Sequence, residues 1–448
     1  MVSKQELIKK DQAHWFHPLG MPAEAPHFIF TKGEGCYLWD IDGNKYLDFS
    51  SGGVHLCNLG HNHPKLIEAA TKQMNEFCYY SSGAPVASNI PAIEYCDELA
   101  GVLPAGIDHV YLTVTGTEST ESCIQIARAY WESVGELGKY KIIALDRAYH
   151  GSSQLSRSMT GAHVGLACFS RRSPEVVKMP NFVTGIENCF KTEEENARYL
   201  EQVIQQEGAD TISCVMAEVA QGNGGVVWPG EKWWPITREI CSKHNILLIA
   251  DEVQTGFCRT GKFWGVDHYG VIPDMISMAK GINGGILPFG AVGFSNKIFD
   301  AMVSSKKKLM SYTTSDGNAV VLATALAALR IYRDDKMADR VAKLGALLSK
   351  RLNEFTKLPV VDAPMGKGLY QSFLISLNKT TGKPYNAEAT VAAREKLTAE
   401  CLKQGLMLTY CDGYPHRQPI VPPFIITEEQ LNHGLDIIYS VLKDIKPV

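Results

Sequence analysis

Six short apolar runs recur through the middle of the chain, and they constrain its fold more than any other feature. Each run is nearly continuous in apolar residues, a pattern that predicts strands buried on both faces of a mostly parallel sheet. Apolar residues at helical spacing in Glu118–Ser133 and around Asn196–Gln206 predict helices between strands. This alternation indicates an α/β fold that binds ligands at the carboxyl ends of its strands. The runs are His109–Val114, Lys141–Leu145, Ile212–Ala217, Ile246–Ala250, Met275–Ala279 and Gly290–Phe294.

The two flanks of this central region have a different pattern. Residues 27–49 alternate around an Asp42-Gly43-Asn44 turn, which is typical of a β-meander. From Ala319 onward the sequence predicts an Ala/Leu-rich helix, a second helix over Lys336–Thr356, and a mixed α+β tail that ends in Glu428–Lys446. A chain of 448 residues has room for two or three domains. We therefore predict a large domain over residues 59–320 and a small α+β domain built from residues 1–58 and 321–448.

Composition excludes several classes of protein. With 45% hydrophobic residues, 21% charged residues and a net charge of −4, the chain suits neither disorder nor binding to nucleic acid. No apolar run approaches the roughly 20 residues that cross a bilayer, and the first residues lack the apolar core of a signal peptide. The twelve cysteines stand singly without a CxxC pair, which favours free thiols over a metal site. We expect a cytoplasmic protein without metal or membrane contact.

Polar motifs follow the predicted strands. Thr115-Gly116-Thr117 stands between a strand and a helix, where free N–H groups can bind an anion such as phosphate. Tyr149-His150-Gly151 follows the next strand, where the aromatic ring could stack on a flat ligand. Taken singly, the first motif is better explained by ordinary helix capping and the second by loop packing.

Charged residues stand at the ends of three further apolar runs. Asp251 and Glu218 each end a buried run, and a carboxylate there requires a cationic or hydrogen-bonding partner. Lys280 ends another run beside a glycine-rich loop, where burial should lower its pKa, as a Schiff-base lysine requires. Together with the two preceding motifs, these residues offer a phosphate anchor, a ring face, an anion for a pyridinium nitrogen and an imine partner. Pyridoxal phosphate requires all four.

From about Asp11 to its C-terminus, the chain resembles the class III aminotransferases of the fold-type I pyridoxal-phosphate superfamily. The most specific stretch is residues 247–285, which read LLIADEVQTGFCRTGKFWGVDHYGVIPDMISMAKGINGG. The supporting motifs are LWDIDGNKYLDF, GHNHP, TGTES, YHG, AEVAQGNGG and VPPFIIT. The resemblance implies a large domain with a mostly parallel sheet and a small α+β domain.

The resemblance also implies roles for single residues. Lys280 would form a Schiff base with the coenzyme and then move protons, Asp251 would pair with the pyridinium nitrogen, and Gln254 would bond the phenolic oxygen. Thr314 would reach the phosphate of a neighbouring subunit, which implies a homodimer with shared active sites and leaves open a tetramer. The other implied contacts are Gly116 and Thr117 at the phosphate, Tyr149 stacked on the ring, His150 behind it, and Glu218 near the ring.

Departures from the family pattern bear on the substrate. Many members carry an arginine just before the C-terminal Pro-Pro, where it holds the substrate α-carboxylate; here HRQPIVPPF puts Pro419 at that position, with Arg417 nearby. The segment YTTSDGNA resembles dialkylglycine-decarboxylase relatives, but Ser51-Gly52-Gly53 lacks the glutamine that those relatives have, which argues against decarboxylation. The resemblance therefore implies transfer of an amino group from an ω-type primary amine to a keto acid such as pyruvate or 2-oxoglutarate.

Two alternatives remain open on the sequence. The family includes racemases and also lyases that release ammonia from small β-substituted amines of the phospho- or phosphono-ethanolamine type. An anionic substituent on such an amine could be bound by Arg157, His163, Arg171 and Arg172. The second alternative is a binding protein without catalysis, against which the presence of Lys280, Asp251 and Gln254 together argues.

Overall fold

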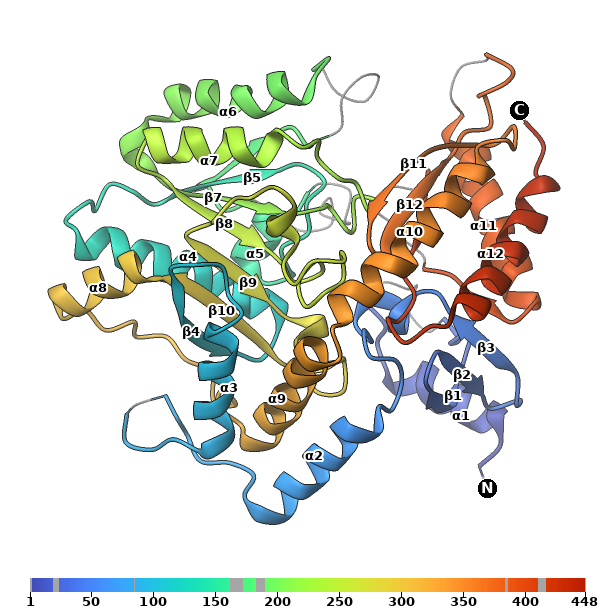
Figure 1. Cartoon of the computed structure of the whole chain (residues 1–448), viewed down its shortest axis with the longest axis horizontal. Coiled ribbons are helices and arrows are strands. Elements are labelled where there is room, and N and C mark those ends of the chain that lie inside the picture. Colours follow the sequence, from blue (N-terminus) through green and yellow to red (C-terminus); the bar gives the residue numbers. More distant parts are fainter. Residues whose placement is uncertain are drawn as a thin grey trace.

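The larger part of the molecule, on the left in Figure 1, is built on a seven-stranded sheet of order β4-β10-β9-β8-β7-β5-β6. Our computed structural model describes residues 2–18, 24–83, 85–161, 172–182, 190–382, 386–409 and 416–447. All the strands run parallel except β10, which is antiparallel to both of its neighbours. The predicted mixed α/β fold with a mostly parallel sheet is confirmed. The strands are β4 (Ile107–Thr113), β5 (Lys141–Leu145), β6 (Val176–Met179), β7 (Ile212–Glu218), β8 (Leu247–Asp251), β9 (Met275–Met278) and β10 (Gly290–Ser295).

Both faces of this sheet are covered by helices. In β8, Leu247 and Ile249 pack into one apolar cluster, whereas Leu248 and Ala250 pack into another on the opposite face. The first cluster includes side chains of α4 (Gly116–Ser133), α5 (Gln154–Met159) and α8 (Asn296–Ser305). The second includes side chains of α3 (Ile90–Ala100), α6 (Glu193–Glu207), α7 (Trp233–Lys243) and α9 (Ala319–Asp334). Burial on both faces is the reason that the strands are continuously apolar.

Two smaller sheets lie beside the large one. One has the order β1-β2-β3-β13 and begins as the predicted meander, and the other has the order β11-β12-β14. Strand β13 runs parallel to β3, so segments from both ends of the chain share one sheet. The strands are β1 (Phe30–Glu34), β2 (Tyr37–Asp40), β3 (Lys45–Asp48), β11 (Val361–Lys367), β12 (Tyr370–Ile375), β13 (Leu406–Met407) and β14 (Arg417–Ile420).

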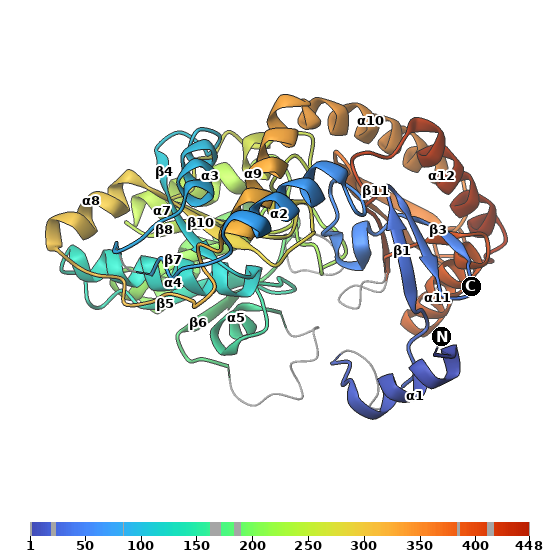
Figure 2. The same ribbon diagram turned by 90° about the horizontal axis from the view of Figure 1, so that it is seen from below.

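Helices from the two ends of the chain complete the structure. In Figures 1 and 2 both termini lie on the side of the molecule that carries α10, α11 and α12. The boundary predicted at 320/321 falls inside the first turn of helix α9, and α9 contacts α2 and α3. The division of the chain into domains stays a prediction. No helix in the described ranges is long and apolar enough to cross a membrane. The remaining helices are α1 (Lys4–His14), α2 (Pro64–Glu76), α10 (Met337–Phe355), α11 (Ala387–Lys403) and α12 (Glu428–Lys443).

A tight turn after β3, η1 (Ser51–His55), crosses from the small sheet to the large one. It is held by Asp48, a fully buried carboxylate that accepts hydrogen bonds from Ser50 N and Gly52 N at 2.7 Å each. His61 Nε2 lies 2.9 Å from the second oxygen of Asp48. Gly52 and Gly53 adopt φ values of 80° and 86°, a left-handed conformation that glycine adopts without steric strain. The turn thereby reaches the carboxyl edge of the large sheet.

Candidate active site

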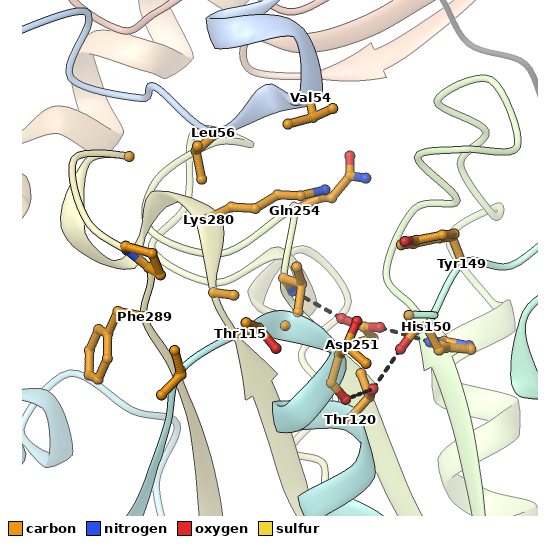
Figure 3. A pocket seen from close by; sticks show the side chains of 18 of the residues that line it. Val54, Leu56, Thr115, Thr120, Tyr149, His150, Asp251, Gln254, Lys280 and Phe289 are labelled. Atoms are coloured by element: carbon orange, nitrogen blue, oxygen red, sulfur yellow. Dashed lines mark hydrogen bonds and ion pairs between the residues drawn. The ribbon is translucent and has the colours of Figure 1, made fainter. Parts of the chain in front are cut away.

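A cavity of about 490 Å³ opens at the carboxyl edge of the large sheet (Figure 3). Its walls come from the ends of β4, β5, β7, β8 and β9, from the first turn of α4, and from the turn after β3. Eight of the ten residues predicted from the sequence line it. They are Gly116, Thr117, Tyr149, His150, Glu218, Asp251, Gln254 and Lys280.

The first turn of α4 faces the cavity. Thr115 caps this 18-residue helix by accepting a hydrogen bond from Glu118 N at 3.1 Å, and Gly116 and Thr117 follow it along the cavity wall. A Cβ on Gly116 would lie 3.1 Å from Val253 Cγ1, so the absence of a side chain lets the helix start pack against the strand end. The free N–H groups and the positive end of the helix dipole make this wall suitable for a phosphate.

Asp251 is fixed at the floor of the cavity by three contacts. Its Oδ2 lies 2.7 Å from His150 Nδ1, and its Oδ1 accepts from Ser277 Oγ and Val253 N at 3.0 Å each. Both Asp251 and His150 are buried. The other ring nitrogen of His150 has no hydrogen-bond partner among the described residues. The carboxylate is therefore held rigidly, with the histidine directly behind it, as Figure 3 shows.

Glu218 positions the loop that carries the aromatic residue. Its two carboxyl oxygens accept from Tyr149 N at 2.8 Å and from Gly222 N at 2.9 Å. Burial, together with the charge of Asp251, raises the pKa of Glu218 to about 8, so this carboxyl is mostly protonated at pH 7. A neutral carboxyl can lie beside a flat ligand without adding a second negative charge.

Lys280 follows β9 and points into the cavity. Its backbone has φ of 49°, an uncommon value for a residue with a side chain, at the start of the short helix η5 (Lys280–Asn283). Burial lowers the pKa of Lys280 to about 8, although the nearby Glu218 and Asp251 raise it. A substantial fraction of the amine is thus neutral near pH 8, the form that attacks a carbonyl carbon. Figure 3 shows Lys280 and Gln254 side by side at the top of the cavity.

Gln254 has two partners that the sequence did not indicate. Its Oε1 accepts from Tyr370 Oη at 2.5 Å and lies 2.8 Å from His55 Nδ1. These residues stand 116 and 199 positions away in the chain. Neither belongs to a recognisable motif, so only the folded chain brings them together.

The other predicted residues lie elsewhere. Arg417 is buried in β14, where it donates to Ser372 Oγ at 3.0 Å and to Ala363 O at 2.7 Å, and it does not line the cavity. Thr314 is exposed in the loop before α9, and its carbonyl accepts a hydrogen bond from the Tyr79 hydroxyl.

The basic residues considered for an anionic substituent are only partly described. Arg157 donates from Nε to Ser152 O at 3.3 Å, and Arg172 is exposed. His163 and Arg171 lie outside the described residues. Within the described ranges there is no group of three or more His, Cys, Asp or Glu side chains that could hold a metal ion.

Comparison with known proteins agrees with this geometry. The family described as aminotransferase class-III matches residues 20–442, almost the whole chain. The chain belongs to this family. The aminotransferase is 32% identical over 410 residues to the putrescine–pyruvate aminotransferase of Pseudomonas aeruginosa, and the match covers 90% of this chain and 88% of that protein.

Two solved structures are also similar to the aminotransferase. An (S)-enantioselective omega-transaminase from Thermomicrobium roseum superposes with a TM-score of 0.91 at 32% identity, covering 99% of this chain and 98% of that one. An omega transaminase from Pseudomonas jessenii, solved in complex with PMP, superposes with a TM-score of 0.91 at 26% identity, covering 98% of each chain.

The aminotransferase is a pyridoxal-phosphate enzyme that transfers an amino group from an amine to a keto acid. The residues of the cavity fit this coenzyme. A helix start lies where a phosphate can bind, a buried carboxylate lies on the floor, and a lysine of lowered pKa reaches in from above.

Proposed function

We propose that the amino donor is a primary amine whose reacting carbon bears no carboxylate, and that the acceptor is a small keto acid such as pyruvate or 2-oxoglutarate. One observation carries this proposal: Lys280 is the only lysine or arginine among the described residues that line the cavity. None of these described lining residues offers a guanidinium to an α-carboxylate, so a donor without that group loses no such contact, and the keto acid binds its carboxylate without an arginine from this lining. Pro419 pairs with Ser372 inside the small sheet, and Arg417 is engaged with Ser372 and Ala363.

The apolar side of the cavity supports the same donor class. Val54 and Leu56 enter from the turn after β3, and Ile286, Leu287 and Phe289 come from the loop before β10. Such a wall favours the uncharged carbon chain or ring of an amine over a second carboxylate. The similarity to an enzyme named for putrescine and pyruvate makes a diamine the first donor to test.

For the coenzyme, we infer that the start of α4 holds the phosphate through Gly116 and Thr117, with Tyr149 stacked on the ring. Asp251 is then the anion at the pyridine nitrogen, and its hydrogen bonds from Ser277 and Val253 keep it in that position. The bound coenzyme supplies an electron sink for the bond broken at the amine carbon. Lys280 holds or releases a proton at Nζ, a task that suits a pKa of about 8.

We also propose that two copies of the chain form a dimer in the cytoplasm. A patch of exposed apolar side chains supports the dimer, because isolated apolar residues are common on surfaces whereas a cluster of this kind is not. Tyr312 packs against Gly83, and the Tyr79 hydroxyl contacts Thr314, so the two segments that carry these exposed side chains meet beside the threonine predicted to reach a neighbouring site. The patch consists of Phe77, Tyr79, Tyr80, Val86, Ile90, Met310 and Tyr312.

The cytoplasmic location is supported by cysteine chemistry. Nine cysteines lie in the described ranges, and all nine are free thiols, as expected in a reducing compartment. They are Cys36, Cys57, Cys78, Cys96, Cys123, Cys214, Cys241, Cys258 and Cys401.

The donor is tested by a half-reaction without keto acid. Purified enzyme loaded with coenzyme is mixed in turn with putrescine, 4-aminobutyrate, 1-phenylethylamine, alanine and phosphoethanolamine, while the visible absorption and free ammonia are followed together. We expect putrescine or phenylethylamine to convert one equivalent of coenzyme to its aminated form without ammonia, and alanine to react more slowly. Alanine, the aminated product of pyruvate, would react in reverse of the acceptor step, so the proposed donor class is refuted if alanine converts the coenzyme and none of the amines without an α-carboxylate does. Repeated ammonia release with phosphoethanolamine would instead identify a lyase.

A further inference from the structure

The side-chain amide of Gln254 is held by two donors on the same atom. Tyr370 Oη and His55 Nδ1 both lie at hydrogen-bond distance from Oε1, at 2.5 and 2.8 Å. A carbonyl oxygen has two lone pairs, so these two contacts use its full capacity. The NH2 group of the amide is then left for the cavity. Figure 3 shows the oxygen of Gln254 turned away from Tyr149 and the nitrogen turned toward that side of the cavity.

The surroundings of His55 favour a donating ring nitrogen. The ring is buried, and burial together with the charge of Lys280 lowers its pKa to about 3, although the hydrogen bond to Gln254 and, more weakly, the charge of Asp48 act in the opposite direction. His55 is therefore neutral and carries a single N–H, which must lie on Nδ1 if it is to bond the Gln254 oxygen. The ring also packs edge-on against Tyr370, with centroids 5.7 Å apart.

The space around the amide is equally restricted. A Cβ on Gly222 would lie 2.4 Å from both Gln254 Oε1 and Tyr370 Oη, so only glycine leaves room for this pair. Tyr370 is fully buried in β12, and the indole of Trp228 donates to its carbonyl at 3.3 Å. The backbone of Tyr370 is thus anchored, and this helps to fix the phenol that bonds Gln254.

Two orientations of the amide would behave differently toward the coenzyme. In the observed one, Gln254 presents N–H groups to the cavity and can donate to the electron-rich phenolic oxygen. In the reversed one, a carbonyl oxygen would face that oxygen and repel it. We infer that His55 and Tyr370 are positioning residues that set the Gln254 amide with its NH2 toward the coenzyme. This inference rests on the role proposed above for Gln254.

The experiment uses the variants Tyr370→Phe, His55→Ala, His55→Asn and Gln254→Ala, each with and without coenzyme. Two quantities are measured: the coenzyme dissociation constant, and the pH midpoint of the visible absorption of the loaded enzyme. A donor on the phenolic oxygen draws away electron density that otherwise helps to retain a proton beside it, so losing the donor should raise the midpoint. For Tyr370→Phe and His55→Ala we expect about 3- to 10-fold weaker binding and a midpoint higher by about 0.5 to 1 unit, the scale of one hydrogen bond.

Two controls separate positioning from general damage. His55→Asn keeps an N–H near the Nδ1 position and tolerates the φ of 63° at this residue, so it should bind coenzyme within about two-fold of the parent. In the Gln254→Ala background, neither Tyr370→Phe nor His55→Ala should add a further shift, because the amide that they position is gone. Undiminished effects in that background, or an Asn variant as impaired as the Ala variant, would overturn the inference.

The same variants distinguish two failures: that Gln254 does not contact the coenzyme, and that His55 and Tyr370 do not position its amide. If Gln254→Ala itself leaves the midpoint and the binding unchanged, the role of Gln254 is wrong. If Gln254→Ala shifts both while Tyr370→Phe and His55→Ala do not, the amide contacts the coenzyme but is positioned by other groups, and the inference alone fails.

Discussion

At the scale of single residues, two adjacent acids at the end of β8 have opposite tasks. Asp251 faces the cavity, whereas Glu252 points to the other side, as successive residues of a strand do. Glu252 accepts from Thr255 Oγ1 at 2.5 Å, Gly265 N at 2.9 Å and Val266 N at 2.8 Å. Burial raises the pKa of Glu252 to about 7 despite these bonds. One acid therefore faces the cavity, and its neighbour holds the loop after the strand.

The lowered pKa of Lys280 makes a prediction about coenzyme uptake. With a pKa of about 8, the neutral amine is scarce below pH 7 and dominates above pH 9. The rate at which coenzyme-free enzyme takes up coenzyme should therefore rise about tenfold per pH unit below pH 7 and level off above pH 9. Stopped-flow absorbance between pH 6 and 10 measures it. A rate that still rises tenfold from pH 9 to 10 would indicate an ordinary lysine.

The variant Glu218→Gln tests how much the carboxyl of Glu218 contributes to the pKa of Lys280. Ionised Glu218 raises the pKa of Lys280, and Glu218 itself ionises only near pH 8, so Glu218→Gln should move the part of the uptake profile around and above pH 8 to lower pH. Lys280→Ala serves as the blank, since it should bind coenzyme without a covalent bond that borohydride can trap. An unchanged midpoint in Glu218→Gln would show that burial and the remaining charges, Asp251 among them, set the pKa without Glu218.

The sequence predicted which residues lie together at the cavity where they stand in one contiguous stretch, while their roles stay predictions. Asp251, Gln254 and Lys280 lie within 30 positions of one another, and all three line the cavity. His55 and Tyr370 were missed because their link to Gln254 exists only after folding. Neither residue differs in sequence context from an ordinary buried histidine or tyrosine.

At the scale of elements, strand prediction depended on burial. Six runs match strands of the large sheet to within two residues, because residues buried on both faces give a continuous apolar signal. Strand β6 was missed: it has four residues, includes Lys178, and lies at the edge of the sheet. The turn η1 was also missed. Its shape depends on hydrogen bonds from Ser50 N and Gly52 N to the Asp48 carboxylate, and such side-chain contacts leave no apolar pattern in the sequence.

The contact between Asp48, which holds the turn η1, and His61 should make the free energy of unfolding depend on pH. Burial alone would lower the pKa of His61, but its interactions with Asp48 and, next, with Cys57 raise it from 6.5 to about 9. A histidine whose pKa is higher when folded stabilises the protein fully below pH 6.5 and loses that contribution as pH rises through 9. Relative to His61→Asn, the parent should lose on the order of 2 kcal/mol between pH 6.5 and 9.5.

Thermal denaturation of the loaded enzyme at a series of pH values measures this difference. His61→Asn should melt at a lower temperature than the parent at pH 6.5, and the gap should narrow toward pH 9.5. The comparison relies on the change in the gap with pH, because loss of the contact to the buried Asp48 destabilises the variant at every pH. Parallel curves for the two proteins would assign the pH dependence to other groups.

At the scale of the whole molecule, one buried guanidinium connects segments that are far apart in the chain. Arg259 is fully buried, with the ring of Phe424 4.5 Å from its guanidinium carbon. Its hydrogen-bond partners are all neutral, and no described carboxylate lies within ion-pair distance. They are Ser51 Oγ at 3.2 Å, Asn58 Oδ1 at 2.5 Å, Leu369 O at 3.3 Å and Pro422 O at 2.7 Å.

Replacing this arginine should loosen the N-terminal turn and the C-terminal segment from the large sheet together. Arg259→Met leaves several buried acceptors without a donor, a loss of more than about 3 kcal/mol. We expect a lower melting temperature and weaker coenzyme binding, because Val54 and Leu56 line the cavity from the same turn. Arg259→Lys, which restores a charge but not the fork of donors, should recover only part of the loss. Melting within a degree or two of the parent would show that the contacts are redundant.

The shared active site proposed for the dimer can be tested by mixing two defective chains. Lys280→Ala removes the lysine from its own site, and Thr314→Ala would weaken the site of the neighbouring chain. A heterodimer of the two then has one site that lacks both groups and one site that is intact. If Thr314 serves its own chain instead, the heterodimer has one Lys280→Ala site and one Thr314→Ala site, and neither is intact.

The two arrangements therefore differ in coenzyme binding. We expect the mixture, refolded together, to contain a class of sites with the parental dissociation constant that neither variant shows alone, amounting to about a quarter of all sites when the chains assort at random. Equilibrium titration with coenzyme, followed by absorbance, resolves these sites from the weaker ones. Sedimentation of each variant should first show a dimer, because the exposed apolar patch around Thr314 is unchanged by either substitution. A mixture whose titration is the simple sum of the two variants would place Thr314 at its own site or at none, even if the protein is a dimer.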